Sequence, residues 1–310
     1  MPNTILLSTA LPTITNDLTI TGPGANLLTL RANVGASSVL NIASATVGVY
    51  GLTIAGGVNS YGAGINNGGA LTLNNSVVTD NHASANGGGL QNGGPLFISN
   101  STISGNTAGY GAGIFNYASG VNVGVMKLVN TTFSGNSTNN PGGGDAVEND
   151  HFSGGPGTPI ATLVNCTIAG NSGGSDDIFV YDDGAGGNPT VNIANTILKS
   201  GGAPTIGTVG ATAQVHSGGH NLASDGAGSF LAGTGDQINT NPLLGTLRNY
   251  GGTTPTQYPL PGSPAIDAGD DGAAPTTDQR GIARPQGAHA DIGAVEANNI
   301  EILQTGFDGN

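Results

Sequence analysis

The chain contains a unit that repeats at a nearly fixed spacing between Gly62 and Asn136. One four-residue element recurs in steps of 25 and 24 residues, at 64–67, 89–92 and 113–116. A second element recurs at Asn75, Asn100 and Asn130. Periods of about 20–50 residues are typical of solenoids, in which each repeat contacts only its neighbours. We therefore expect coils of about 25 residues, stacked one upon another.

Short runs of alternating apolar and polar residues fill each repeat, as in half-buried β-strands. Stacking would place equivalent side chains above one another in a shared interior, formed by Leu71, Leu73, Ser76, Val78, Leu96, Ile98, Ser101, Ile103, Leu163, Cys166, Ile168, Ile193, Thr196 and Leu198. Parallel strands would pair from coil to coil, so that buried backbone groups find partners. The pattern predicts an all-β parallel β-helix with few or no α-helices.

Asparagine recurs at two positions of the repeat, and both predict ladders of stacked side chains at turns. Asn tolerates the left-handed backbone conformation and bonds its own backbone there. The first ladder would contain Asn75, Asn100, Asn130, Asn165 and Asn195, and the second Asn81, Asn106, Asn136 and Asn171. The step in the first set rises from 25 to 30, then 35, then 30 residues, so the later coils carry insertions.

The chain is expected to divide into three parts. Residues 1–240 would form the coils, with the clearest repeats at 61–200 and long loops at 137–159 and 173–188. Residues 241–298 are rich in proline and would form an irregular closing segment that covers the solenoid end, because a solenoid otherwise exposes unpaired strand edges. Residues 299–310 would be a tail.

Charge excludes several classes of function. The formal net charge is −13, with only six Lys and Arg, whereas nucleic-acid binding needs clustered basic residues. Anionic membrane surfaces are disfavoured for the same reason. No run of about 18 apolar residues occurs, so no transmembrane helix is expected. The single cysteine, Cys166, rules out an internal disulfide and would fill a stacked position in the core.

The C-terminal part resembles a known bacterial family. Its ordered motifs are 241–245 (NPLLG), 249–256 (NYGGTTPT), 260–269 (LPGSPAIDAG), 277–281 (TDQRG) and 291–296 (DIGAVE). They resemble the terminal module of choice-of-anchor Q domain proteins, and residues 17–26 resemble the first coil of that family. The resemblance implies a right-handed, single-stranded parallel β-helix of pectate-lyase-like shape on a secreted or surface-displayed bacterial protein. The N-terminus shows no signal peptide, so we expect a truncated or mis-started chain.

The acidic residues gather in the two long insertions. Asp145, Glu148, Asp150 and His151 lie in one, and Asp176, Asp177, Asp182 and Asp183 lie about one coil further along. Three interpretations stay open: solvated loop tips, a cation site and catalysis. Crowded carboxylates favour a bound cation, and oxygen ligands suit Ca²⁺, for which the candidates are Asp145, Glu148, Asp176 and Asp177.

Catalysis could take two forms at these residues. Paired carboxylates serve glycoside hydrolysis. A polysaccharide lyase would instead combine carboxylate-bound Ca²⁺ with a basic residue, for which Lys127 is the candidate. Any enzyme would therefore draw on Asp145, Glu148, Asp150, Asp176, Asp177 and Lys127.

Aromatic residues lie near the loops of consecutive coils, and those expected to bind a ligand are Tyr110, Phe115, Tyr117 and Tyr181. Aromatic side chains on the flank of a solenoid can pack against sugar rings. The leading hypothesis is a non-enzymatic secreted or cell-surface protein. Its partner would be an extracellular polysaccharide or another cell-surface component. The alternative is a polysaccharide lyase or glycoside hydrolase on the same scaffold, since one fold hosts both kinds of function.

Overall fold

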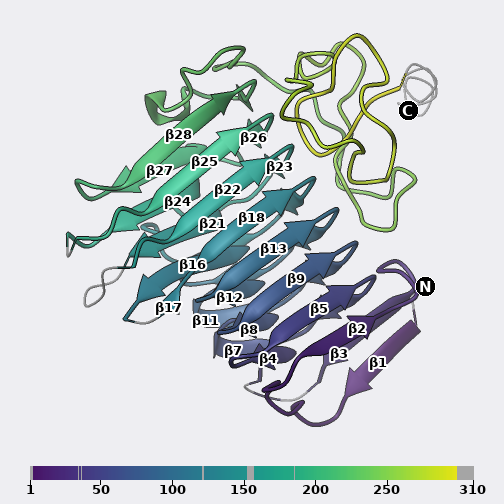
Figure 1. Cartoon of the computed structure of the whole chain (residues 1–310), viewed down its shortest axis with the longest axis vertical. Coiled ribbons are helices and arrows are strands. Elements are labelled where there is room, and N and C mark those ends of the chain that lie inside the picture. The colour runs from purple at the N-terminus through teal and green to yellow at the C-terminus, as the bar shows by residue number, and fades with distance from the viewer. Residues whose placement is uncertain are drawn as a thin grey trace.

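The fold is a parallel β-helix (Figure 1), as the repeats predict. A computed structural model describes residues 3–33, 35, 37–120, 122–151, 157–184 and 186–298. The solenoid has about 8 turns with about 28 residues per turn, longer than the predicted 25 because the later coils carry insertions. Among the described residues the only helical element is a single 3₁₀ turn, η1 (Ala227–Ser229).

Four sheets run along the solenoid, and each coil contributes one strand to most of them. Sheet A contains β1 (Asn3–Leu7), β3 (Leu28–Ala32), β6 (Thr53–Ala55), β10 (Val77–Thr79), β14 (Thr102–Ser104), β19 (Thr132–Ser134), β23 (Thr167–Ala169), β26 (Ile197–Lys199) and β29 (Leu222–Ala223). Sheet B contains β4 (Leu40–Ile42), β8 (Ile65–Asn67), β12 (Leu90–Asn92), β16 (Ile114–Ser119), β21 (Gly144–His151), β24 (Asp176–Asp182) and β27 (Ile206–Val209), with β17 (Asn122–Val123) antiparallel to β16.

Sheet C contains β2 (Leu18–Thr21), β5 (Thr46–Tyr50), β9 (Ala70–Asn74), β13 (Pro95–Ser99), β18 (Val125–Val129), β22 (Ile160–Val164), β25 (Thr190–Ala194) and β28 (Gln214–Gly219). The short sheet D contains β7 (Val58–Tyr61), β11 (His82–Asn86), β15 (Thr107–Ala108) and β20 (Ser137–Thr138). Apart from the β16–β17 pair, the strand pairs of these sheets are parallel, because each strand meets its equivalent in the next coil.

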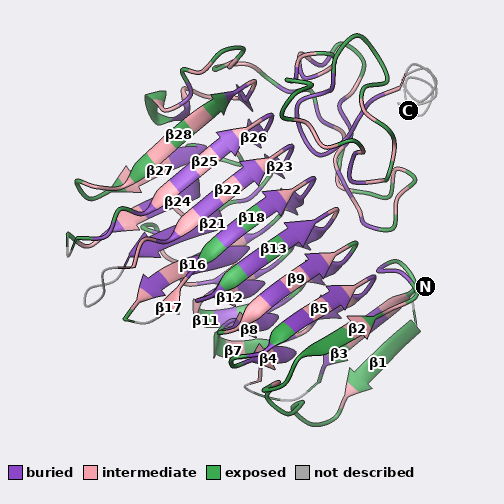
Figure 2. Cartoon of the chain, viewed as in Figure 1, coloured by how far each residue is buried: buried purple, intermediate pink, exposed green. Residues whose placement is uncertain are grey.

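The core is a continuous column of apolar side chains running through the coils. All the side chains predicted to point inward are buried, including the small polar residues at the bends, such as Ser76, Ser101 and Thr196. Figure 2 shows the resulting alternation of buried and partly exposed positions along the strands. Cys166 lies in this column as expected, and burial raises the pKa of its thiol to about 12. The cysteine is therefore a core residue.

Both predicted asparagine ladders are present. Asn81, Asn106 and Asn136 each donate a side-chain hydrogen bond, of 2.9–3.0 Å, to the Oδ1 of the next member, and Asn171 receives the last. The members of the other ladder have φ near +50°, the left-handed conformation that Asn tolerates. In it, Asn130 donates to Asn100 and Asn195 donates to Asn165. The ladders hold the turns of successive coils in register.

The C-terminal segment lies along the flank of sheet A. It accepts side-chain hydrogen bonds from successive coils, including Asn130 to Thr277 O and Asn165 to Asp291 O. The open end of the last coil is covered by residues just before this segment, since Ala227 and Leu231 join the main core cluster. The predicted boundary at residue 240 stays a prediction. The predicted tail, 299–310, lies outside the described residues.

No helix in the described part of the chain is long and apolar enough to cross a membrane.

Candidate functional site

Three adjacent strands of sheet B, namely β16, β21 and β24, place a set of aromatic and acidic side chains on the outer face of the solenoid. Successive side chains of a strand point to opposite faces. In β21, Val147 and Asn149 point inward. Glu148 and Asp150, which alternate with them along the strand, therefore point outward. The paired strands put an aromatic residue on each side of each carboxylate, in the rows Phe115, Glu148, Phe179 and Tyr117, Asp150, Tyr181.

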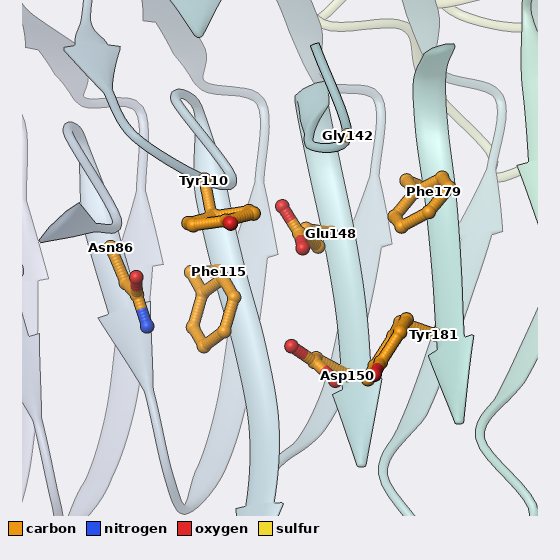
Figure 3. Close-up of a pocket in the computed structure, with 8 residues that line it drawn as sticks. All are labelled: Asn86, Tyr110, Phe115, Gly142, Glu148, Asp150, Phe179 and Tyr181. Atoms are coloured by element: carbon orange, nitrogen blue, oxygen red, sulfur yellow. The ribbon is translucent and has the colours of Figure 1, made fainter. Parts of the chain in front are cut away.

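The two carboxylates form the floor of a cleft of about 340 Å³. It is lined by Asn86, Tyr110, Phe115, Gly142, Glu148, Asp150, Phe179 and Tyr181. Figure 3 shows Glu148 and Asp150 projecting between Tyr110 and Phe115 on one side and Phe179 and Tyr181 on the other. An apolar cleft with a few convergent polar groups is the usual form of a ligand site.

Glu148 is almost fully enclosed, with 2% of its surface exposed. The backbone N–H of Gly144 donates to its Oε2 at 3.1 Å. Burial raises the pKa of Glu148 well above its usual range, and repulsion from Asp150 raises it further, while backbone hydrogen bonds oppose both effects. The enclosed site of Glu148 therefore favours the protonated form of its carboxyl group.

Asp150 is 4% exposed, and within the described residues no group donates a hydrogen bond to its buried Oδ1. Burial raises the pKa of Asp150 to about 7, with a further contribution from Asp183 that His151 partly offsets. The two carboxyl groups of the cleft therefore differ in environment. One accepts a backbone hydrogen bond, and the other presents an oxygen to the cleft.

The acidic residues predicted to lie in long loops belong mostly to strands, so the interpretation as solvated loop tips is wrong. β21 and β24 carry Asp145, Glu148, Asp150, Asp176 and Asp177, and all five are buried. The alternation of apolar and polar residues does not reveal these two strands, because acidic residues occupy their ends and their outward-facing positions. Residues 152–156 and Ala185 of the two predicted loops lie outside the described residues. The prediction that the two acidic groups belong to neighbouring coils is confirmed, since β21 pairs with β24.

Three of these carboxyl groups, those of Asp145, Asp176 and Asp177, lie apart from the cleft. Asp145 Oδ1 accepts hydrogen bonds from the backbone and hydroxyl of Thr138 and from the N–H of Gly174, at 2.8–2.9 Å. Burial raises the pKa of Asp145 and Asp176, and it raises the pKa of Asp177, beside Asn171, well above its usual range. They are not lining residues of the cleft.

Lys127 does not join the carboxylates. It lies on β18 in sheet C, where it pairs with Phe97 and Thr162, and its side chain is exposed. Among the described residues that line the cleft, none is Lys or Arg. The predicted grouping of Lys127 with the acidic residues is therefore wrong, because adjacent sheets of a coil face different directions.

The predicted calcium ligands, Asp145, Glu148, Asp176 and Asp177, are not brought together as one ligand set within the described chain. The group whose ligand atoms do lie within 4.8 Å of one another is His151, Asp182 and Asp183. His151 Nδ1 lies 3.2 Å from Asp183 Oδ1 and 3.5 Å from Asp182 Oδ1. These three side chains form a compact polar cluster at the end of β21 and around the end of β24.

Of the aromatic residues predicted to bind a ligand, Tyr110, Phe115 and Tyr181 line the cleft. Tyr117 lies next to it, with its ring centroid 6.0 Å from that of Phe115. Sequence reasoning missed Phe179 and Asn86. The alternation of residues 178–181, Ile-Phe-Val-Tyr, carries the signal for Phe179, because it places Phe179 on the same face as Tyr181.

No protein-family model, curated protein or solved structure matches the chain. The resemblance to choice-of-anchor Q domain proteins thus stays a prediction.

Proposed function

We propose that the cleft over β16, β21 and β24 binds a segment of an extracellular polysaccharide. The observation that carries this is the pairing of aromatic residues on β16 and β24 across the carboxylates of β21. The flanking strands are two strand spacings apart, roughly 9–10 Å, which leaves room for a sugar ring between the aromatic faces. Aromatic faces pack against the C–H faces of sugars, and carboxyl groups accept or donate hydrogen bonds to hydroxyls.

The compartment is part of the same proposal. A secreted or cell-surface protein of a bacterium would meet such a polymer directly, and the motifs of residues 241–298 support this compartment through their resemblance to surface proteins. In that setting the long rigid solenoid would serve adhesion, with the cleft as its contact with the polymer. The carbohydrate site and the compartment are separate claims, and binding to a purified polymer tests the first.

The test is retention of the purified full chain by a panel of soluble neutral, acidic and amine-bearing polysaccharides, followed by calorimetry on the best ligand. Tyr181→Ala should weaken binding roughly tenfold, the loss of about 1.4 kcal/mol of aromatic contact. Phe97→Ala is the matched control, because Phe97 is an exposed aromatic residue on sheet C. Retention of no polymer, or equal weakening by both variants, would rule the proposal out.

Of the enzymatic alternatives, glycoside hydrolysis is the second candidate. The specific observation in its favour is that Glu148 and Asp150 share one cleft and one face of β21. Elimination by a lyase is disfavoured, since the base predicted for it, Lys127, lies on another sheet.

A further inference from the structure

We infer that Glu148 and Asp150 are the general acid and general base of a glycoside hydrolase whose substrate is an uncharged glycan. This inference rests on the proposed binding of a sugar chain in the cleft. It adds an activity, a role for each carboxyl group and a charge class for the substrate.

The two carboxyl groups are carried by one rigid strand. They are two residues apart on one face of β21, so their Cα atoms are separated by roughly 6.6 Å. Asn149, between them, fixes the strand from inside. It accepts a hydrogen bond from Asn116 at 2.6 Å and donates to the carbonyls of Pro159 and Thr190 at 3.1 Å. Both side chains therefore project from one rigid strand onto the same cleft.

The environments of the two groups give them different roles. Glu148 is enclosed and accepts a backbone hydrogen bond from Gly144, and burial favours its protonated form, which suits a proton donor. Asp150 has a buried Oδ1 with no hydrogen-bond donor among the described residues. Its side chain lines the cleft and points between the aromatic residues (Figure 3). A carboxylate oxygen without a hydrogen-bond donor is a stronger proton acceptor than one that is already hydrogen-bonded. Two carboxyl groups whose environments separate their protonation states are the pattern of an acid and base pair.

Water is the only reactant that the reaction needs besides the glycan. Glu148 gives its proton to the glycosidic oxygen as the bond between that oxygen and the anomeric carbon breaks. Asp150 takes a proton from the water whose oxygen bonds to the anomeric carbon. The products are two shorter chains, one with a new reducing end. Glu148 is then ionised and Asp150 protonated, and exchange of one proton with solvent restores both.

The charge of the cleft selects the substrate class. Two carboxyl groups face the ligand, and no Lys or Arg is among the described lining residues. The net charge of the whole chain is −13. A uronate would bring its carboxylate next to Asp150 with no cation to balance it, and like charges in such a site cost several kcal/mol. The cleft therefore favours uncharged sugars over pectin-like chains.

The experiment incubates the full chain with uncharged chains (amylose, a galactomannan and hydroxyethyl cellulose) and with polygalacturonate. It measures retention, new reducing ends and unsaturated ends separately. We expect reducing ends from an uncharged chain, and a rate roughly tenfold or more lower on polygalacturonate. Glu148→Gln and Asp150→Asn should each lower the rate roughly 100-fold or more while retention stays within about threefold. Asp80→Asn, at an exposed turn, is the control.

The outcomes separate the two proposals. Retention of an uncharged chain without new reducing ends would overturn hydrolysis and leave carbohydrate binding standing, whereas retention of no chain would overturn both. Unsaturated ends would show elimination and so contradict the acid and base roles. Full activity of Glu148→Gln in a folded protein would remove Glu148 from the reaction, and cleavage of polygalacturonate alone would overturn the charge selection.

Discussion

Asn116 donates a hydrogen bond of 2.6 Å from its Nδ2 to the Oδ1 of Asn149, across 33 residues of chain. This bond continues a third buried ladder, in which Asn67 donates to Asn92 and Asn92 donates to Asn116, both at 2.7 Å. The earlier members are 25 and 24 residues apart. The added residues of the longer coil are therefore accommodated outside the ladder, and β21 enters the stack in register with β16.

Replacing Asn149 should destabilise the fold locally and globally. Asn149→Ala leaves the Asn116 amide and the carbonyls of Pro159 and Thr190 short of a partner in a buried site. Each unsatisfied buried group costs about 1–3 kcal/mol, so we expect the free energy of unfolding to fall by at least about 2 kcal/mol in urea titrations. Asn139→Ala, at an exposed position, should change it by less than about 0.5 kcal/mol. Equal stability of the two variants would contradict the role of the ladder.

The repeats predicted the solenoid, the inward residues and two of the three ladders, because those features depend on local spacing. The third ladder was missed although Asn67, Asn92 and Asn116 stand in the repeated element itself. Whether a side chain at a strand end turns inward depends on the bend that follows, and this is set by the neighbouring coil.

The site was predictable only in part. Composition and spacing indicated that acidic and aromatic residues gather in the later coils, and they identified Glu148, Asp150 and Tyr181. They could not separate Glu148 and Asp150 from Asp145, because the two-residue alternation of β21 is broken by a register shift between Gly144 and Val147. Composition and spacing also could not exclude Lys127 from the site, because the bends of each coil determine which sheet a residue belongs to.

The repeated glycines at Gly64, Gly89 and Gly113 are expected to be intolerant of substitution. A Cβ at Gly89 would lie 2.6 Å from Gly113 O and 3.0 Å from Asn106 Nδ2. Because these neighbours are backbone and ladder atoms, Gly89→Ala must separate two coils. We expect a loss of about 1–3 kcal/mol in chemical unfolding. Gly226→Ala, where a Cβ meets nothing within 4 Å, should be close to neutral. A neutral Gly89→Ala would show that the coils can move apart at little cost.

Asp150→Asn should stabilise the protein at high pH. The pKa of Asp150 in the fold is about 7, against an ordinary aspartate value of 3.8. Between these values the folded state binds a proton that the unfolded state has lost, so this group lowers stability as pH rises from about 4 to about 7. Asp150→Asn has no carboxyl group to titrate at this position, so its stability does not fall for this reason. Its melting temperature should match that of the wild type at pH 4 and exceed it by several degrees at pH 8.

The control for this measurement is Asp80→Asn, which removes an exposed carboxylate and should leave the pH dependence of stability unchanged. A gain for Asp150→Asn that is equal at pH 4 and pH 8 would assign the effect to something other than titration. The expected gain also bears on function, since a group that costs stability in its ionised form is often one that serves a site.

Gln279 should hold the C-terminal segment against sheet A. Its Oε1 accepts from Thr132 Oγ1 at 2.6 Å, and its Nε2 donates to Thr102 Oγ1 at 3.1 Å and Thr254 Oγ1 at 2.9 Å. Gln279→Ala removes these buried contacts, at a cost of about 1–3 kcal/mol. We expect faster amide hydrogen exchange in residues 241–298 with little change in β5 and β9. Gln286→Ala, at an exposed position of the same segment, should leave exchange unchanged. Uniformly faster exchange along the whole solenoid would argue against local docking.

The pH dependence of glycan cleavage should follow the two carboxyl groups. The reaction needs Asp150 ionised and Glu148 protonated. The rate should rise with pH through about 7 as Asp150 ionises, and burial of Glu148, which raises the pKa of its carboxyl well above the usual range, favours the proton that it must donate. Burial raises the pKa of Asp150 most, and the charged groups that act on it are Asp183, which raises its pKa, and His151, which lowers it. Asp183→Asn removes the repulsion between Asp183 and Asp150. It should therefore lower the pKa of Asp150 and move the rising limb of the pH–rate profile to lower pH.

This shift distinguishes an electrostatic effect from a structural one, because simple damage to the cleft would lower the rate at every pH without moving the limb. Asp80→Asn again supplies the matched loss of a carboxylate far from the cleft, and its limb should coincide with that of the wild type. A limb that stays in place in Asp183→Asn, or moves to higher pH, would mean that Asp150 is not the group whose ionisation controls the rate.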